Sequence, residues 1–183
     1  MSKFTIFDAT TAPEKAKPLL ENSIKAFGMI PNLHGVMAGS PELLEGYQVL
    51  HDLAQKTDFT VEQLTVVWQS INVFHNCHYC VPAHTAIATS MKVSKEVNEA
   101  LRNETPLPTD ELNVLRETVL ELVVNRGVLS DTQKQRFLDA GFKPRNILDI
   151  ILILGQKVLS NYVNHVAETP VDKPFQSFAW TKA

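Results

Sequence analysis

Residues 68–85 read Trp68-Gln-Ser-Ile-Asn-Val-Phe-His-Asn-Cys77-His-Tyr-Cys80-Val-Pro-Ala-His84-Thr, and they contain both cysteines of the 183-residue chain. The proline at position 82 lacks a backbone N–H, and its ring is tolerated only in the first turn of a helix or at a kink. We therefore expect one helix to end near Asn76 and a second helix to begin around residues 77–79. Both sulfur atoms would then lie at the N-terminus of the second helix.

The helix that precedes the cysteines has a clear start in the sequence. Thr60 and Gln63 form the pattern of a capping box, and Phe59 can pack against Leu64 across it. Apolar residues then recur at offsets of three and four, which is typical of a helix with one buried face. They are Leu64, Val67, Trp68 and Ile71.

Signals for further helices are spread over the rest of the chain. Candidate starts, recognised by capping residues or an early proline, are Thr11-x-x-Glu14, Ser40-Pro41, Ser94, Thr109 and Ser130-x-x-Gln133. Gly127 and Gly141 are placed to end two helices, and a long helix follows Pro144, with residues 147–154 expected to be buried. Alternation with a period of two is nearly absent, so the sequence predicts an all-α fold.

Composition limits the class of protein. Hydrophobic residues make up 44% of the chain and charged residues 20%, as in a soluble globular domain, and the length suits one domain over residues 1–183. The formal net charge is −3 without a basic stripe, so we expect no nucleic-acid partner. No run approaches the roughly 20 apolar residues that cross a membrane. Residues 1–8 lack the pattern of a secretory signal, which predicts a cytoplasmic location.

Cys77, Cys80 and His84 are the candidate catalytic residues. A helix N-terminus favours a thiolate over a thiol, and Cys80 and His84 share a helix face because they are four residues apart. His84 can therefore act as the base for Cys80, which would attack a peroxide and become a sulfenic acid. Cys77, one turn away, would donate a proton and then form a disulfide with Cys80. An external dithiol would reset this pair.

Other roles for the cysteines remain open at this stage. They could be small buried side chains, with His84 in the core, or they could bind zinc together with His84. A fourth zinc ligand would come from one of four other histidines, His51, His75, His78 or His165. Haem attachment is excluded because Val81, and not a histidine, follows the second cysteine, and a thioredoxin-like site is disfavoured because a helix precedes the pair.

The stretch Trp68–Thr85 resembles the core of the alkylhydroperoxidase D (AhpD) and carboxymuconolactone decarboxylase family. The flanking segments beginning at Gly28-Met-Ile-Pro31, Ser40-Pro-Glu, Ser160-Asn-Tyr and Thr169-Pro-Val resemble its peroxidase-related branch, so the resemblance covers nearly the whole chain. It implies an AhpD-like helical bundle that forms a homotrimer or hexamer, with no metal or cofactor. It also implies peroxide reduction in which the second cysteine, here Cys80, becomes the sulfenic acid, and the first, Cys77, donates the proton.

The sequence departs from the family at one position. The best-studied members carry a proton-relay glutamate twelve residues before the first cysteine, where this chain has Thr65. Glu62, one turn earlier, could replace it, although a glutamate near a helix start also stabilises the helix dipole. Without a firm relay, general disulfide reduction becomes a second possible activity. The decarboxylase branch generally lacks the cysteine pair, which argues against lactone decarboxylation.

The sequence thus predicts a thiol-dependent antioxidant oxidoreductase that reduces alkyl hydroperoxides or disulfides. Its redox core would lie at about residues 59–93, and a tail at about 166–183. The alternative is a non-enzymatic oligomeric protein that senses redox state or binds zinc. The tail is apolar with little periodicity, so it either packs across a subunit interface or lies as a strap over its own core.

Overall fold

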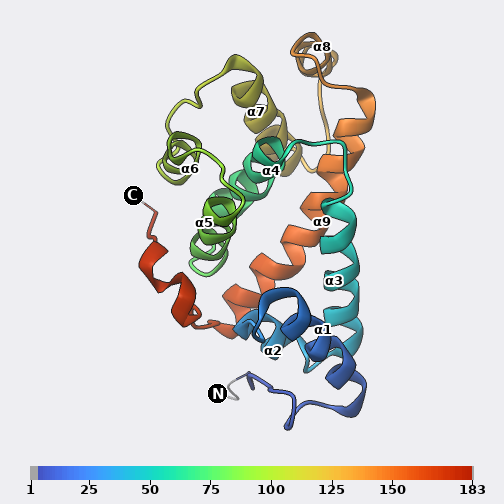
Figure 1. Cartoon of the computed structure of the whole chain (residues 1–183). Helices are drawn as coiled ribbons and strands as arrows, with labels where there is room; N and C mark the ends of the chain where they lie inside the picture. Colours follow the sequence, from blue (N-terminus) through green and yellow to red (C-terminus); the bar gives the residue numbers. More distant parts are fainter. Residues whose placement is uncertain (1–3, 183) are drawn as a thin grey trace.

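The computed structural model describes residues 4–182, so Met1–Lys3 and Ala183 at the ends of the predicted domain lie outside the described residues. All regular elements within this range are helices, which confirms the predicted all-α fold (Figure 1). In chain order they are η1 (Glu14–Ala16), α1 (Lys17–Phe27), α2 (Asn32–Met37), α3 (Pro41–Ala54), α4 (Val61–Phe74), α5 (Cys80–Ser90), α6 (Lys95–Arg102), α7 (Asp110–Val124), α8 (Asp131–Asp139), α9 (Pro144–Ala167) and η2 (Lys173–Phe178).

Helix α4 is the centre of the fold and packs against α5, α6, α7 and α9. Its predicted capping box is confirmed, because the Gln63 N–H donates to Thr60 Oγ1 at 3.2 Å and the Thr60 N–H donates to Gln63 Oε1 at 2.9 Å. Every residue from Leu64 to Val73 is buried. The helix is therefore covered on all sides, more fully than its apolar stripe predicts.

Most of the other predicted helix boundaries are confirmed. The hydroxyls of Ser94, Thr109 and Ser130 each accept a backbone hydrogen bond at the start of α6, α7 and α8. Gly127 and Gly141 follow α7 and α8 with positive φ angles of 89° and 97°, a conformation that glycine adopts at little cost. Helix α3 begins at Pro41 as predicted, although the Ser40 side chain makes no capping bond there.

The predicted capping box at Thr11 and Glu14 is wrong. The Thr11 hydroxyl donates to Asp8 Oδ1 at 2.9 Å, and the same oxygen accepts the backbone N–H groups of Thr10 and Thr11 at 2.8 Å. The Thr11 hydroxyl is therefore engaged in a turn with Asp8 and does not cap a helix. Only a short 3-10 helix follows, and α1 begins at Lys17.

The expectation that residues 147–154 are buried holds for only one face of α9. Ile150 and Ile153 are fully buried, whereas Leu148 and Ile151 are 66% and 46% exposed. In Figure 1, α9 crosses the whole molecule, with α3 beside it and α4 and α5 on its other side. Across the described part of the chain, every helix is too short or too polar to span a lipid bilayer.

The buried apolar residues form two clusters, and the cysteines belong to the second. The larger one joins α4, α6, α7, α8 and the first half of α9 around Trp68 and Phe137. The second joins the N-terminal helices around Leu20, Leu44 and Met37, and it includes Cys77 and Cys80. The two cysteines therefore sit inside packed structure and not on an exposed loop.

The N-terminal segment lies against α2 at Gly35. The Phe7 N–H donates to the Gly35 carbonyl at 3.0 Å. A Cβ atom added to Gly35 would lie 2.7 Å from Ile6 Cγ2 and 2.8 Å from the Phe7 carbonyl oxygen. Glycine is therefore required at this position by close contact with the neighbouring backbone.

We predict that Gly35→Ala destabilises the protein by about 1–3 kcal/mol, the usual cost of an overpacked contact. The matched control is Gly46→Ala in α3, where an added Cβ meets nothing within 4 Å. That change should stabilise the protein by about 0.5–1 kcal/mol, because alanine favours a helix. Urea unfolding of both variants measures the difference, and equal effects of the two substitutions would contradict the predicted contact.

Candidate active site

The turn between α4 and α5 brings the two cysteines together. Helix α4 ends at Phe74, Asn76 adopts a positive φ of 54°, and α5 begins at Cys80 with Tyr79 as its N-cap. The second helix thus starts one to three residues later than predicted. Pro82 lies in its first turn, where its missing N–H costs no helical hydrogen bond. Cys77 lies in the turn itself, and its carbonyl accepts the Val81 N–H at 3.1 Å.

The sulfur atoms of Cys77 and Cys80 are 2.6 Å apart, and both side chains are buried. The Cys80 backbone N–H donates to Cys77 Sγ at 3.2 Å. Two amides of α9 donate to Cys80 Sγ, from Asn161 Nδ2 at 3.0 Å and from Asn164 Nδ2 at 3.2 Å. Cys80 is therefore surrounded by donors, which stabilise a charged sulfur.

These contacts give the two sulfurs different acidities. Burial alone raises the pKa of the Cys80 thiol, but the hydrogen bond from Cys77, the charge of Lys157 and the two amides together lower this pKa to about 6. Burial, followed by the hydrogen bond that Cys77 donates to Cys80, raises the pKa of Cys77 far above its ordinary range. Near neutral pH the pair is a Cys80 thiolate beside a Cys77 thiol.

Lys157 is a fully buried residue of α9 that lies in the same site. Its Nζ is 2.8 Å from Nε2 of His84, which lies one turn along α5 from Cys80. Burial lowers the pKa of Lys157, while the nearby sulfurs, Cys80 first and then Cys77, raise it. Burial, followed by the charge of Lys157, lowers the pKa of His84 well below its ordinary value, so the imidazole is neutral. Among the described residues, His84 makes no direct hydrogen bond to Cys80.

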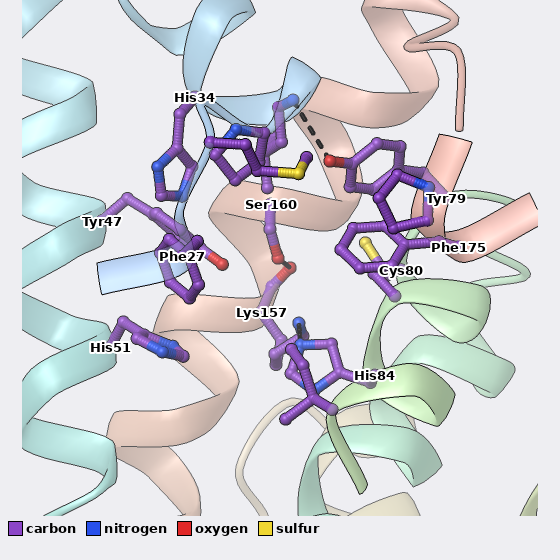
Figure 2. Close-up of a pocket in the computed structure, with 16 residues that line it drawn as sticks. Phe27, His34, Tyr47, His51, Tyr79, Cys80, His84, Lys157, Ser160 and Phe175 are labelled. Atoms are coloured by element: carbon purple, nitrogen blue, oxygen red, sulfur yellow. Dashed lines mark hydrogen bonds between the residues drawn. The ribbon is translucent and has the colours of Figure 1, made fainter. Parts of the chain in front are cut away.

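A cavity of about 240 Å³ opens onto Cys80, His84 and Lys157. Figure 2 shows Lys157 pointing from α9 towards His84, with Tyr47 and His51 of α3 across the pocket. Most of the lining is apolar or aromatic and includes Phe27, Met29, Leu33, Ile87, Pro174 and Phe175. The site therefore combines one reactive sulfur and one buried cation with walls that suit an organic molecule.

The C-terminal tail lies over this site as a strap on its own chain. The Tyr79 hydroxyl donates to Asp172 Oδ2 at 2.5 Å, and the same carboxylate accepts the Asn32 backbone N–H. His78 Nε2 is 2.9 Å from the Thr169 carbonyl oxygen. Both residues between the cysteines are thus bonded to the tail. The tail residues Thr169 and Asp172 therefore contact their own chain, as the strap alternative predicts.

The histidines that were candidate zinc ligands do not gather around the cysteines. His75 Nδ1 contacts Asn161 Oδ1 at 2.8 Å, His51 Nδ1 contacts Gln156 Nε2 at 3.2 Å, and His165 is exposed. His84 faces the ammonium of Lys157, which repels a metal cation. Among residues 4–182, no three histidine, cysteine or acidic side chains converge on one point as metal ligands.

The candidate relay positions are separate from the pocket. Thr65 is buried, and its hydroxyl donates to the Val61 carbonyl at 2.8 Å within α4. Glu62 is half-buried and is not among the described residues that line the cavity. The charged group beside His84 is Lys157, which the sequence analysis missed.

The polar face of α9 was the available signal for these missed residues. Lys157, Asn161 and Asn164 lie at offsets of four and three along α9, so they share one face. All three are buried. Buried polar residues need hydrogen-bond partners. Here Asn161 and Asn164 donate to Cys80, and Lys157 contacts His84.

Solved structures resemble this chain over nearly its whole length. An uncharacterized peroxidase-related protein with an alkylhydroperoxidase AhpD core, from Ralstonia eutropha JMP134, has a TM-score of 0.80 at 16% identity, with 96% of each chain covered. The chain has the AhpD-like fold. A peroxidase-related protein from Silicibacter sp. TM1040 has a TM-score of 0.77 at 18% identity, with 95% of each chain covered.

A third similar structure of this AhpD-like fold is a cysteine-to-alanine variant of the debrominase Bmp8 in complex with 2,3,4-tribromopyrrole. Its TM-score is 0.74 at 15% identity, and the match covers 97% of this chain and 95% of that one. No protein-family model and no curated protein matches the sequence. At these identities the comparisons establish the fold, and the chemistry of the chain has to be argued from its own residues.

We predict that one thiol of the reduced protein titrates with a pKa of about 6 and that the other stays protonated well into the alkaline range. The ultraviolet absorbance of the thiolate, followed against pH, measures both. Cys80→Ser should remove the acidic transition, whereas Cys77→Ala should shift it upward because the Cys80 sulfur loses the hydrogen bond from Cys77. Two transitions close to the ordinary value of about 8.5 would contradict this assignment.

We predict that Asp172→Asn loosens the tail. The substitution weakens the charge-assisted hydrogen bonds from Tyr79 and Asn32, which are worth about 1.5–3 kcal/mol each when made to a charged group. Cleavage by chymotrypsin after the half-buried Phe175 of the tail should become roughly ten-fold faster. Tyr79→Phe, which removes one hydroxyl, should give a smaller increase. An unchanged rate of cleavage in both variants would show that Asp172 does not hold the tail.

Proposed function

We propose that the protein is a thiol-dependent oxidoreductase that reduces organic hydroperoxides through Cys80 and Cys77. The observation that carries this proposal is the unequal pair of sulfurs at the pocket. Cys80 lines the cavity and has a lowered pKa, and Cys77 lies 2.6 Å behind it as a thiol. A peroxide-reducing cycle needs a thiolate that the substrate can reach and a second thiol next to it that can form the disulfide.

The chemical cycle follows from this arrangement. The Cys80 thiolate attacks the terminal oxygen of the hydroperoxide, the O–O bond breaks, and Cys80 becomes a sulfenic acid while an alkoxide leaves. Cys77 then attacks the sulfur of the sulfenic acid, and water is released as the disulfide forms. An external dithiol reduces this disulfide and is itself oxidised. A small disulfide entering the pocket would be reduced by the same two sulfurs.

The pocket favours an organic substrate over hydrogen peroxide. Its walls are mostly apolar, and burying an alkyl group against them contributes about 0.8 kcal/mol per CH₂. Aromatic rings of Phe27, Tyr47 and Phe175 also line the cavity. They suit a flat substrate, so a halogenated aromatic ring, as bound by the similar debrominase structure, is a second candidate electrophile for the thiolate.

We also propose that the protein acts as a homo-oligomer, as a trimer or a hexamer, in the cytoplasm. The outer face of α9 supports assembly, because Leu148, Ile151, Tyr162 and Val166 are large and exposed there. Molecular mass in solution tests this part of the proposal, and a monomer at micromolar concentration would contradict it.

We predict that wild-type protein loses both thiols after one equivalent of cumene hydroperoxide and turns over with dithiothreitol as the donor. Cys80→Ser should lower turnover to background, because Cys77 stays protonated. Cys77→Ser should stop after one equivalent with a single sulfenic acid, which dimedone and mass spectrometry detect.

Three control results distinguish the alternatives. Equal turnover by Cys80→Ser would exclude the assigned nucleophile. A single oxidation of wild type without turnover by any dithiol would indicate a redox sensor and not an enzyme. Rapid consumption of a brominated pyrrole, with hydroperoxides inert, would favour the second candidate substrate.

A further inference from the structure

We propose that Lys157 is the general acid of the reaction, which protonates the leaving alkoxide, and that His84 is the residue that positions it. This inference rests on the proposed function and assigns roles within the same site. It makes Lys157, which was not among the candidate residues from the sequence, the proton donor. It also changes the role of His84 from base to positioning residue.

The ammonium and the reactive sulfur share one cavity. Lys157 and Cys80 both line it, and the charge of Lys157 acts on the Cys80 sulfur, so a substrate in the cavity can reach both groups. Among the partners that residues 4–182 offer to Nζ, the only hydrogen bond is the one to His84 Nε2 at 2.8 Å. An ammonium has three N–H donors, so two remain for a ligand in the pocket.

His84 is suited to hold this ammonium. The ring nitrogen Nε2 accepts from Lys157 only if the proton of the neutral imidazole is on Nδ1. Trp68 packs against the ring, with the centroids 5.0 Å apart, and the Trp68 Nε1 group donates to Gln156 Oε1 at 3.0 Å. The imidazole is therefore fixed from the side of α4 and presents a lone pair to Lys157.

The charges around Lys157 support the transfer of its proton. Lys157 is 1% exposed, and no carboxylate of residues 4–182 forms an ion pair with it. The negative charge that favours the Lys157 ammonium is the thiolate of Cys80. When the sulfur becomes a neutral sulfenic acid, that negative charge moves to the leaving oxygen. The ammonium then faces an alkoxide, which is a much stronger base than a thiolate.

The proton balance closes over the cycle. The thiolate of Cys80 and the hydroperoxide give the sulfenic acid and an alkoxide, which takes a proton from Lys157 and leaves as the alcohol. The Cys77 thiol and the sulfenic acid give the disulfide and water. When an external dithiol reduces the disulfide, one of its two protons goes to Cys77 and the other returns to Lys157, while Cys80 leaves as the thiolate.

The test separates proton donation from the effect of charge by using two oxidants and two substitutions. Alkoxide departure from tert-butyl hydroperoxide needs a proton, whereas acetate departure from peracetic acid needs none. Lys157→Arg keeps the positive charge but holds its proton too tightly to donate it. Lys157→Met removes the charge as well, and Lys25→Met on the exposed face of α1 is the control. The measurement is the rate of Cys80 oxidation in a single turnover, divided by the thiolate fraction from titration.

We expect Lys157→Arg to lose about 100-fold or more with tert-butyl hydroperoxide, the usual contribution of a general acid, and less than about three-fold with peracetic acid. Lys157→Met should show the same contrast after correction for the thiolate fraction. Equal losses with both oxidants, or no loss with either, would overturn the role of Lys157 as a proton donor. A wild-type protein inert to every hydroperoxide would instead overturn the proposed function itself.

Discussion

The attraction between the Lys157 ammonium and the Cys80 thiolate is the interaction on which the site depends. A buried ammonium without a partner is strongly unfavourable, and the described residues offer it no carboxylate. A buried thiolate is unfavourable for the same reason. Each ion therefore stabilises the other, and this attraction adds to the hydrogen bond from Cys77 in lowering the pKa of Cys80, although its side chain is removed from water.

Neutral side-chain amides also stabilise the charged sulfur. Asn161 and Asn164 donate to the sulfur, and Asn161 is itself held by donating to Asn72 Oδ1 at 3.0 Å. The Asn72 side chain in turn donates to Gln69 Oε1 at 2.9 Å. This network links α9 to α4 through side chains that are all buried. Because amides do not titrate, it keeps its geometry while the sulfur changes charge.

The sequence predicts the local features of this protein well and the long-range ones poorly. The capping boxes at Thr60 and Ser130 and the pairing of Cys77 with Cys80 depend on residues a few positions apart. Lys157 meets His84 only because α9 crosses α5, which no local pattern encodes. The prediction of a helix start at Thr11 is wrong for a local reason, because Asp8 forms a hydrogen bond with the Thr11 hydroxyl.

The order in which the chain is made gives the site a further property. Cys77 and Cys80 are synthesised before α6, α7 and α8, whereas Lys157, both asparagines and the tail residue Asp172 come after them. On the ribosome, the thiols therefore lack the cation and the amides that make one of them acidic. A nascent chain therefore carries two cysteines without the α9 residues that lower the pKa of Cys80, and this pKa falls only when α9 docks.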